Sequence, residues 1–136
     1  MAKLKDIPQE GRVPVGATLR YEEILVKTYF VDQEVKAYSH ASNNPVFSAL
    51  IHLRGKPSMT GASATSAEIH FYPDGDTRIS VPTYNEHQKR IELYAPLSAL
   101  PDYMATLSGE GDLICGYFEA RVGPEHNGYL RRLAKR

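Results

Sequence analysis

A histidine and two glutamates are the residues of this sequence best suited to chemistry. Glu68 and His70 lie two positions apart, so a β-strand would point both side chains to the same face. Glu92 lies in a later segment with the same alternation of apolar and polar residues. A carboxylate beside an imidazole orients the ring and raises its basicity, which is the minimum arrangement for general-base catalysis. His70 with Glu92 or Glu68 is therefore a candidate catalytic pair of hydratase or hydrolase type.

The segment 67–95 must position these residues, and its pattern predicts three antiparallel strands. Apolar and polar residues alternate along it, as in strands that are buried on one face only. The apolar positions are Ile69, Phe71, Ile79, Val81, Ile91 and Leu93. We predict turns around 74–76 and 84–88, because connections with an odd number of residues keep these apolar side chains together on the core face.

The predicted middle strand, 78–81, separates the strands that carry His70 and Glu92. Neighbouring strands lie about 4.8 Å apart, so the backbones of these two residues would be about 9–10 Å apart and their side chains would meet only through Ser80 or a water molecule. Pro82 cannot donate a hydrogen bond within a central strand, so we end this strand before it.

The face opposite the core is rich in aromatic and ionisable side chains. The chain has nine tyrosines, four phenylalanines and no tryptophan, and tyrosine is enriched on surfaces that are wet alone and buried against a partner. We predict that this face binds a small molecule or a protein partner, with self-association into a homodimer. The predicted binding residues are Glu68, His70, Tyr72, Arg78, Ser80, Glu92 and Tyr94, with Tyr117 and Arg121 from a later strand. The alternative is that a helix covers this face.

No cofactor or metal site is predicted. To bind a metal ion, Glu68 and His70 would need a third ligand such as His52 or His87, and the sequence has no signature spacing of metal ligands. Cys115 is interpreted as an inert strand residue, because the sequence fixes no base beside it.

Length and composition indicate one domain. The 136 residues can bury one core, and we assign 17–136 to this domain and 1–16 to an irregular N-terminal arm.

Sixteen basic and sixteen acidic residues give a net charge of zero, which argues against nucleic acid or an anionic membrane as the partner. We expect no signal peptide or membrane span, because the N-terminal residues lack an apolar stretch. A single cysteine excludes an intrachain disulfide, so we expect a cytoplasmic location.

The rest of the chain predicts an α+β fold. Residues 17–31 and 113–122 are rich in β-branched and aromatic residues and predict strands, with a helix as the alternative for 17–31. An N-cap-like aspartate and a partly apolar face predict a helix over 32–42, and an i, i+3, i+4, i+7 pattern predicts another over 99–107. We therefore expect a single α+β domain in which two helices pack on an antiparallel sheet of about five strands.

The stretch DQEVKAYSHASNNPV, residues 32–46, resembles the central-helix region of the MaoC-type hydratases, which are hotdog-fold enzymes. In that family a similar helix leads into a loop that carries an Asp and, after Asn-Pro, a His. In this sequence no Asp follows Ser42, and Phe47 stands where the His would fall. The resemblance implies a hotdog-like fold as an alternative but carries over none of the family's acid-base residues, and we do not assign the chain to that family. For residues 46–54 the sequence predicts either a short helix or a strand.

Overall fold

The computed structural model describes residues 18–38, 45–120 and 126–134, which form one seven-stranded sheet and one α-helix. In chain order the strands are β1 (Thr18–Tyr38), β2 (Pro45–Pro57), β3 (Ser66–Tyr72), β4 (Thr83–Asn85), β5 (Arg90–Pro96), β6 (Leu113–Ala120) and β7 (His126–Arg132). Across the sheet the order is β4-β5-β3-β2-β1-β6-β7. Neighbouring strands are antiparallel except β3 and β5, which are parallel. A 3-10 turn, η2 (Leu97–Ala99), and the helix α2 (Leu100–Leu107) connect β5 to β6.

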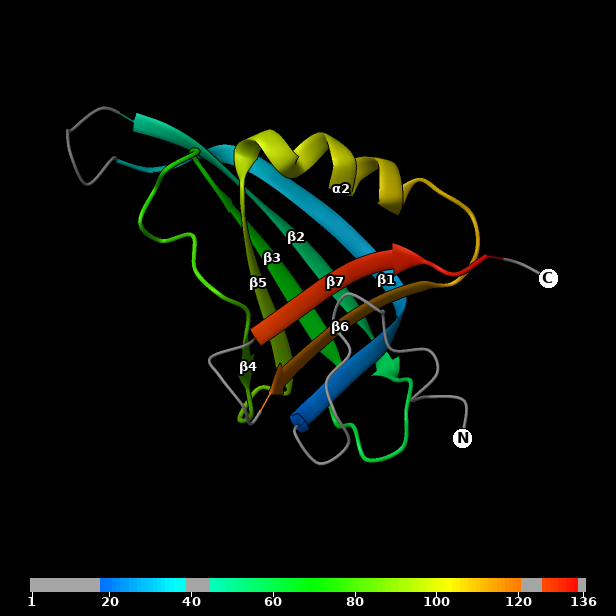
Figure 1. The fold of residues 1–136 in the computed structure, drawn as a ribbon. Coiled ribbons are helices and arrows are strands. Elements are labelled where there is room, and N and C mark those ends of the chain that lie inside the picture. The colour runs from blue at the N-terminus through cyan, green and yellow to red at the C-terminus, as the bar shows by residue number, and fades with distance from the viewer. Residues whose placement is uncertain (1–17, 39–44, 121–125, 135–136) are drawn as a thin grey trace.

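The sheet curls, so that strands from its two ends face each other across a common core (Figure 1). The Tyr84 ring of β4 stacks on the Tyr117 ring of β6, with centroids 6.3 Å apart. The β7 backbone at Gly128 lies so close to Leu93 of β5 that a β-carbon there would collide with the leucine side chain. The inner face of the curl is therefore the core, and its side chains include Ile24, Ile51, Leu53, Ile69, Phe71, Ile91 and Leu93.

The helix α2 confirms the helix predicted over 99–107. It lies over one end of the curled sheet (Figure 1), where Leu107 is buried and the Tyr103 ring packs edge-on against Phe71 with centroids 5.1 Å apart. Arg132 of β7 donates hydrogen bonds to three backbone carbonyl oxygens at and just after the last turn. The Thr106 and Leu107 carbonyl oxygens belong to the last turn, whose carbonyls have no donors within the helix, so Arg132 stabilises the point where α2 stops.

The helix predicted over 32–42 is wrong for the residues that the structure describes. Residues 32–38 continue β1, and they pair with β2 along a register that runs from Ile24 opposite Pro57 to Tyr38 opposite Pro45. Pairing along a long hairpin outweighs the weak helical signal of a cap-like aspartate. The central helix implied by the hydratase resemblance is therefore also absent from 32–38. The remainder of the predicted helix, 39–42, lies outside the described residues, as do the N-terminal arm and Arg121.

The predicted middle strand, 78–81, is also wrong. Residues 73–82 form an irregular connection in which Val81 is 52% exposed, and a short strand, β4, begins only at Thr83. Pro82 gives the physical reason, because it cannot complete the hydrogen bonds of a central strand. As a result β3 pairs directly and in parallel with β5.

Strand β6 was predicted with one core face and one polar face, but both of its faces are buried. Tyr117, predicted for the polar binding face, points into the core beside Cys115, and the two residues are 2% and 0% exposed. Phe118 on the opposite side is 1% exposed, because the Tyr21 ring stacks against it at 5.6 Å.

The predicted α+β fold, with two helices on an antiparallel sheet of about five strands, is therefore replaced by a seven-stranded, mixed and curled sheet with one short helix in the described residues. The strand alternative is correct for 46–54, which lies within β2. Among the described residues, no helix is long and apolar enough to cross a membrane.

A test of the packing around β6 is the substitution Gly116→Ala. A β-carbon at this position would lie well inside the contact distance of the Tyr129 ring of β7, so we expect a loss of about 1–3 kcal/mol in the free energy of unfolding from overpacking. The matched control is Gly109→Ala, where the nearest atoms are 3.4 Å away and we expect a change within about 0.5 kcal/mol. Urea unfolding followed by circular dichroism measures both, and equal stabilities for the two variants would contradict this packing.

Candidate functional site

Strands β3 and β5 place their polar side chains on the outer face of the sheet. Burial alternates residue by residue along both strands, with Ile69 and Phe71 at 0% exposure on the inner face. The predicted sorting of apolar and polar residues in these two strands is confirmed. In the parallel register Glu68 lies opposite Glu92 and His70 opposite Tyr94, so the polar residues of two sequence segments form adjacent rows.

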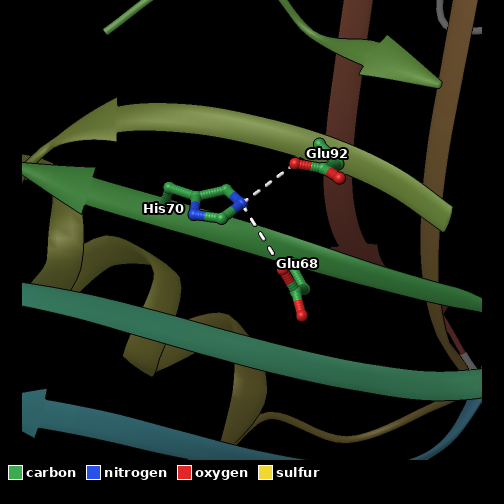
Figure 2. A group of neighbouring side chains, drawn as sticks. All are labelled: Glu68, His70 and Glu92. Carbon is green, nitrogen blue, oxygen red and sulfur yellow. Dashed lines mark hydrogen bonds and ion pairs between the residues drawn. The ribbon is translucent and has the colours of Figure 1, made fainter. Parts of the chain in front are cut away.

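His70 lies between the two glutamates (Figure 2). Its Nε2 atom forms a 3.2 Å hydrogen bond with Glu92 Oε1 and lies 3.5 Å from Glu68 Oε1. The predicted separation of about 9–10 Å between His70 and Glu92 is wrong, because no strand intervenes between β3 and β5. All three side chains keep 15–21% of their surface exposed. The group is therefore accessible to a ligand while its side chains are held in place.

The contacts continue onto β2 and β1. His52 Nδ1 lies 3.5 Å from Glu68 Oε2, and its Nε2 lies 3.3 Å from Asp32 Oδ2. The Phe30 ring stacks on the His52 ring at 4.2 Å and is itself 56% exposed. Acidic and imidazole side chains thus alternate across the four neighbouring strands β1, β2, β3 and β5.

Arg90 holds the far side of Glu92. Its Nη2 and Nε atoms donate to Glu92 Oε2 at 2.9 and 3.1 Å, and Nε also lies 3.7 Å from Glu68 Oε1. The pKa of Glu92 is lowered. Burial alone would raise it, because burial favours the neutral carboxyl group. This effect is outweighed by the hydrogen bonds and charge of Arg90, by the charge of His70 and by the Tyr94 hydroxyl. Glu92 is therefore ionised at neutral pH.

Aromatic rings border the group on one side. The Tyr94 ring stacks on His70 at 5.1 Å and the Tyr72 ring at 6.4 Å. Arg78 reaches over Tyr72 at 4.3 Å from the irregular connection, and Asp76 holds it there with an ion pair of 2.7 Å. Arg78 therefore joins Tyr72 on this face from the irregular connection, and not from a strand between Tyr72 and Tyr94.

The structure brings together six of the nine predicted site residues, which are Glu68, His70, Tyr72, Arg78, Glu92 and Tyr94. Ser80 is exposed and its hydroxyl donates to the carbonyl oxygen of Val81 at 3.4 Å, so it does not join them. Tyr117 lies in the core, and Arg121 lies outside the described residues.

Sequence reasoning missed Asp32 as a member of this group. Its cap-like position before Gln33 and Glu34 was interpreted as a helix start, whereas it lies in β1 opposite Leu50 of β2. The usable signal was the β-branched and aromatic run 28–31 directly before Asp32, which favours a strand that continues through it. His52 was named only as a third metal ligand, and the structure places it beside Glu68.

A second polar cluster surrounds Glu23, which is 8% exposed. Its carboxylate accepts hydrogen bonds from the hydroxyls of Tyr129 and Ser58, and Tyr21 and Tyr129 share a 2.7 Å hydrogen bond. Burial and then the charge of Glu23 strongly raise the pKa of Tyr129. The cluster borders a pocket of about 220 Å³, lined by Tyr21, Glu23, Met59, Ile114, Arg131, Arg132, Leu133 and Ala134. Its hydrogen bonds join β1, β7 and the 58–65 loop, which is a structural role.

The chemistry of the outer group follows from its donor atoms. A histidine hydrogen-bonded to an ionised glutamate can accept a proton as a general base. One imidazole nitrogen and two carboxylate oxygens can also hold a cation, and among the described residues this is the group of three such side chains close enough to do so. Cys115 has no comparable role, because burial raises the pKa of its thiol and keeps it in the unreactive form.

Comparisons with family models, with curated proteins and with solved structures find no match to this chain. Function is therefore inferred from the geometry alone.

Stability at alkaline pH tests the buried cluster around Glu23. The pKa of Tyr129 is raised in the folded state. The contribution of Tyr129 to the free energy of unfolding is therefore fully present below the unfolded-state pKa of about 10, and it is lost as the pH rises toward the folded-state pKa. We expect Tyr129→Phe to lower the free energy of unfolding by about 1–3 kcal/mol at pH 7, through loss of the hydrogen bond to Glu23.

The difference between wild type and Tyr129→Phe should shrink above about pH 10, as urea unfolding at a series of pH values would show. Tyr29→Phe removes a hydroxyl that donates to the Leu107 carbonyl oxygen from a ring that is 44% exposed, so it controls for the loss of one hydrogen-bonded phenol that is not buried against a carboxylate. A difference that stays constant from neutral to alkaline pH would contradict the proposed burial of Tyr129 against Glu23.

Proposed function

We propose that this protein acts by binding, and that it binds through the outer face of β2, β3 and β5. The observation that carries the proposal is the connected group of charged and aromatic side chains around His70, in which each of the three central residues stays 15–21% exposed. Part-buried polar groups that converge on one spot are typical of ligand sites.

For a small-molecule ligand, the charges of this face favour one that presents a positive group. Asp32, Glu68 and Glu92 carry three negative charges, and Arg90 supplies one positive charge among them. Asp76 already neutralises Arg78. The carboxylates of the group therefore outnumber its one arginine, and the rings of Tyr72 and Tyr94 beside it suit a cation as well.

A second copy of this chain is the protein partner that we propose first. The Phe30 ring is 56% exposed beside the His52 ring on the outer face, and large aromatic rings are enriched in the buried centre of interfaces. The same face would take a cationic small molecule if the chain does not self-associate. A cytoplasmic location and the absence of a nucleic-acid partner stay predictions from the cysteine count and the net charge.

The oligomeric state tests this proposal. We expect light scattering during size-exclusion chromatography to give a dimer for wild type and a smaller mass for Phe30→Ser, because the substitution removes the exposed ring from the interface. Met104→Ser is the matched control, since Met104 is also a large exposed side chain at 38% but lies on α2, away from this face. A wild-type monomer at every concentration would eliminate self-association, and equal dimers in both variants would move the interface elsewhere.

General-base catalysis at His70 is a second candidate function, favoured by the 3.2 Å hydrogen bond to Glu92. This distance lies at the end of the range in which a carboxylate orients a catalytic imidazole. The reaction would be a hydrolysis or a hydration, in which His70 takes a proton from water.

Hydrolysis of an activated aryl ester tests the catalytic candidate. We expect a wild-type rate above that of buffer, which His70→Ala lowers by about 10²–10⁴-fold, the usual contribution of a general base. His87→Ala serves as the control, because His87 is exposed in the turn between β4 and β5. Equal rates for wild type and His70→Ala would end this candidate.

A further inference from the structure

Three potential ligand atoms on the outer face converge on one point. His70 Nε2, a Glu68 oxygen and a Glu92 oxygen all lie within 4.8 Å of one another, and Figure 2 shows the two carboxylates directed to the same ring nitrogen. The nitrogen carries at most one hydrogen, so it can make one linear hydrogen bond and not two. A cation placed among the three atoms would satisfy both carboxylates together.

The spacing fits the coordination sphere of a small metal ion. Zinc binds nitrogen and oxygen at about 2.0–2.1 Å in a tetrahedral arrangement, which puts neighbouring ligand atoms about 3.3 Å apart. The distances from His70 Nε2 to Glu92 Oε1 and Glu68 Oε1 are 3.2 and 3.5 Å. The two glutamate oxygens lie within 4.8 Å of each other, so side-chain rotation that brings them to this spacing would let a metal ion fit.

The second oxygen of each glutamate already has a partner that would hold it in place. Arg90 donates to Glu92 Oε2, and His52 lies 3.5 Å from Glu68 Oε2. The Oε1 atoms face His70, where the Tyr94 hydroxyl also contacts Glu92 Oε1 at 3.3 Å and Arg90 lies 3.7 Å from Glu68 Oε1. Partners of this kind orient ligands in protein metal sites.

We propose that Glu68, His70 and Glu92 bind one divalent transition-metal ion of the zinc type. An imidazole nitrogen with two carboxylates suits zinc or cobalt, whereas magnesium and calcium prefer oxygen ligands alone. The inference goes beyond the proposed binding function, because it requires no partner. Three protein ligands leave one tetrahedral position open, where water or a group of a bound partner is the fourth ligand.

Metal titration of the full chain, purified without a histidine tag and freed of metal with a chelator, tests the site. We expect isothermal titration calorimetry to give one Zn²⁺ per chain, and Co²⁺ to give the intense visible absorption of a tetrahedral complex. Mg²⁺ and Ca²⁺ should not compete. The variants His70→Ala, Glu68→Gln and Glu92→Gln should each weaken Zn²⁺ binding at least about tenfold, since loss of orienting partners alone has effects of 10–100-fold.

His87→Ala and Glu110→Gln are the controls, because both residues are exposed and lie outside the group. Both should bind Zn²⁺ as wild type does. Far-ultraviolet circular dichroism shows whether each variant is folded, and Glu92→Gln keeps the size of the side chain if His70→Ala does not fold. Absence of Zn²⁺ binding by wild type would overturn the proposal, and so would binding that folded Glu92→Gln and Glu68→Gln retain. Light scattering in chelator separates this result from self-association, which needs no metal.

Discussion

The parallel pairing of β3 with β5 is the constraint on which the outer group depends. Every other neighbouring pair of strands in the described sheet is antiparallel. With this register Glu68 stands opposite Glu92, two positions before His70 meets Tyr94, so the imidazole reaches diagonally to the neighbouring carboxylate. A strand inserted between β3 and β5 would separate His70 from Glu92 by about 5 Å more. The chemistry of this face therefore follows from strand order as much as from residue type.

The sequence is informative about which side of a strand each residue occupies. Alternation predicted the inner and outer residues of β3 and β5 correctly, because one residue in two is apolar and a shift by one position would expose them all. Helix α2 was equally readable, since its apolar side chains recur at helical spacing and pack on Phe71. Five of the nine predicted site residues meet on the outer face because of the alternation in β3 and β5, and Arg78 joins them from the irregular connection.

The sequence does not state which strands are neighbours, and the errors come from that gap. Residues 78–81 alternate like a strand, yet Pro82 and the aspartates before them allow only an irregular connection. Asp32 was assigned to a helix because only its immediate neighbours were considered. Its position in a strand depends on the pairing of β1 with β2, which involves residues further along the chain. Tyr117 was misplaced because the sheet curls and buries both faces of β6. Curvature is a property of the assembled sheet, so no single segment encodes it.

The alternating contacts from Asp32 to Glu92 link strands that are distant in the sequence. One step joins β1 to β2, the next joins β2 to β3, and the last joins β3 to β5. A ligand that binds Glu68, His70 and Glu92 therefore restrains the local unfolding of all four strands together, since their backbone hydrogen bonds break cooperatively. The footprint of an occupied site in amide hydrogen exchange would therefore extend across a band of backbone that includes the long β1–β2 hairpin, well away from the side chains in direct contact with the ligand.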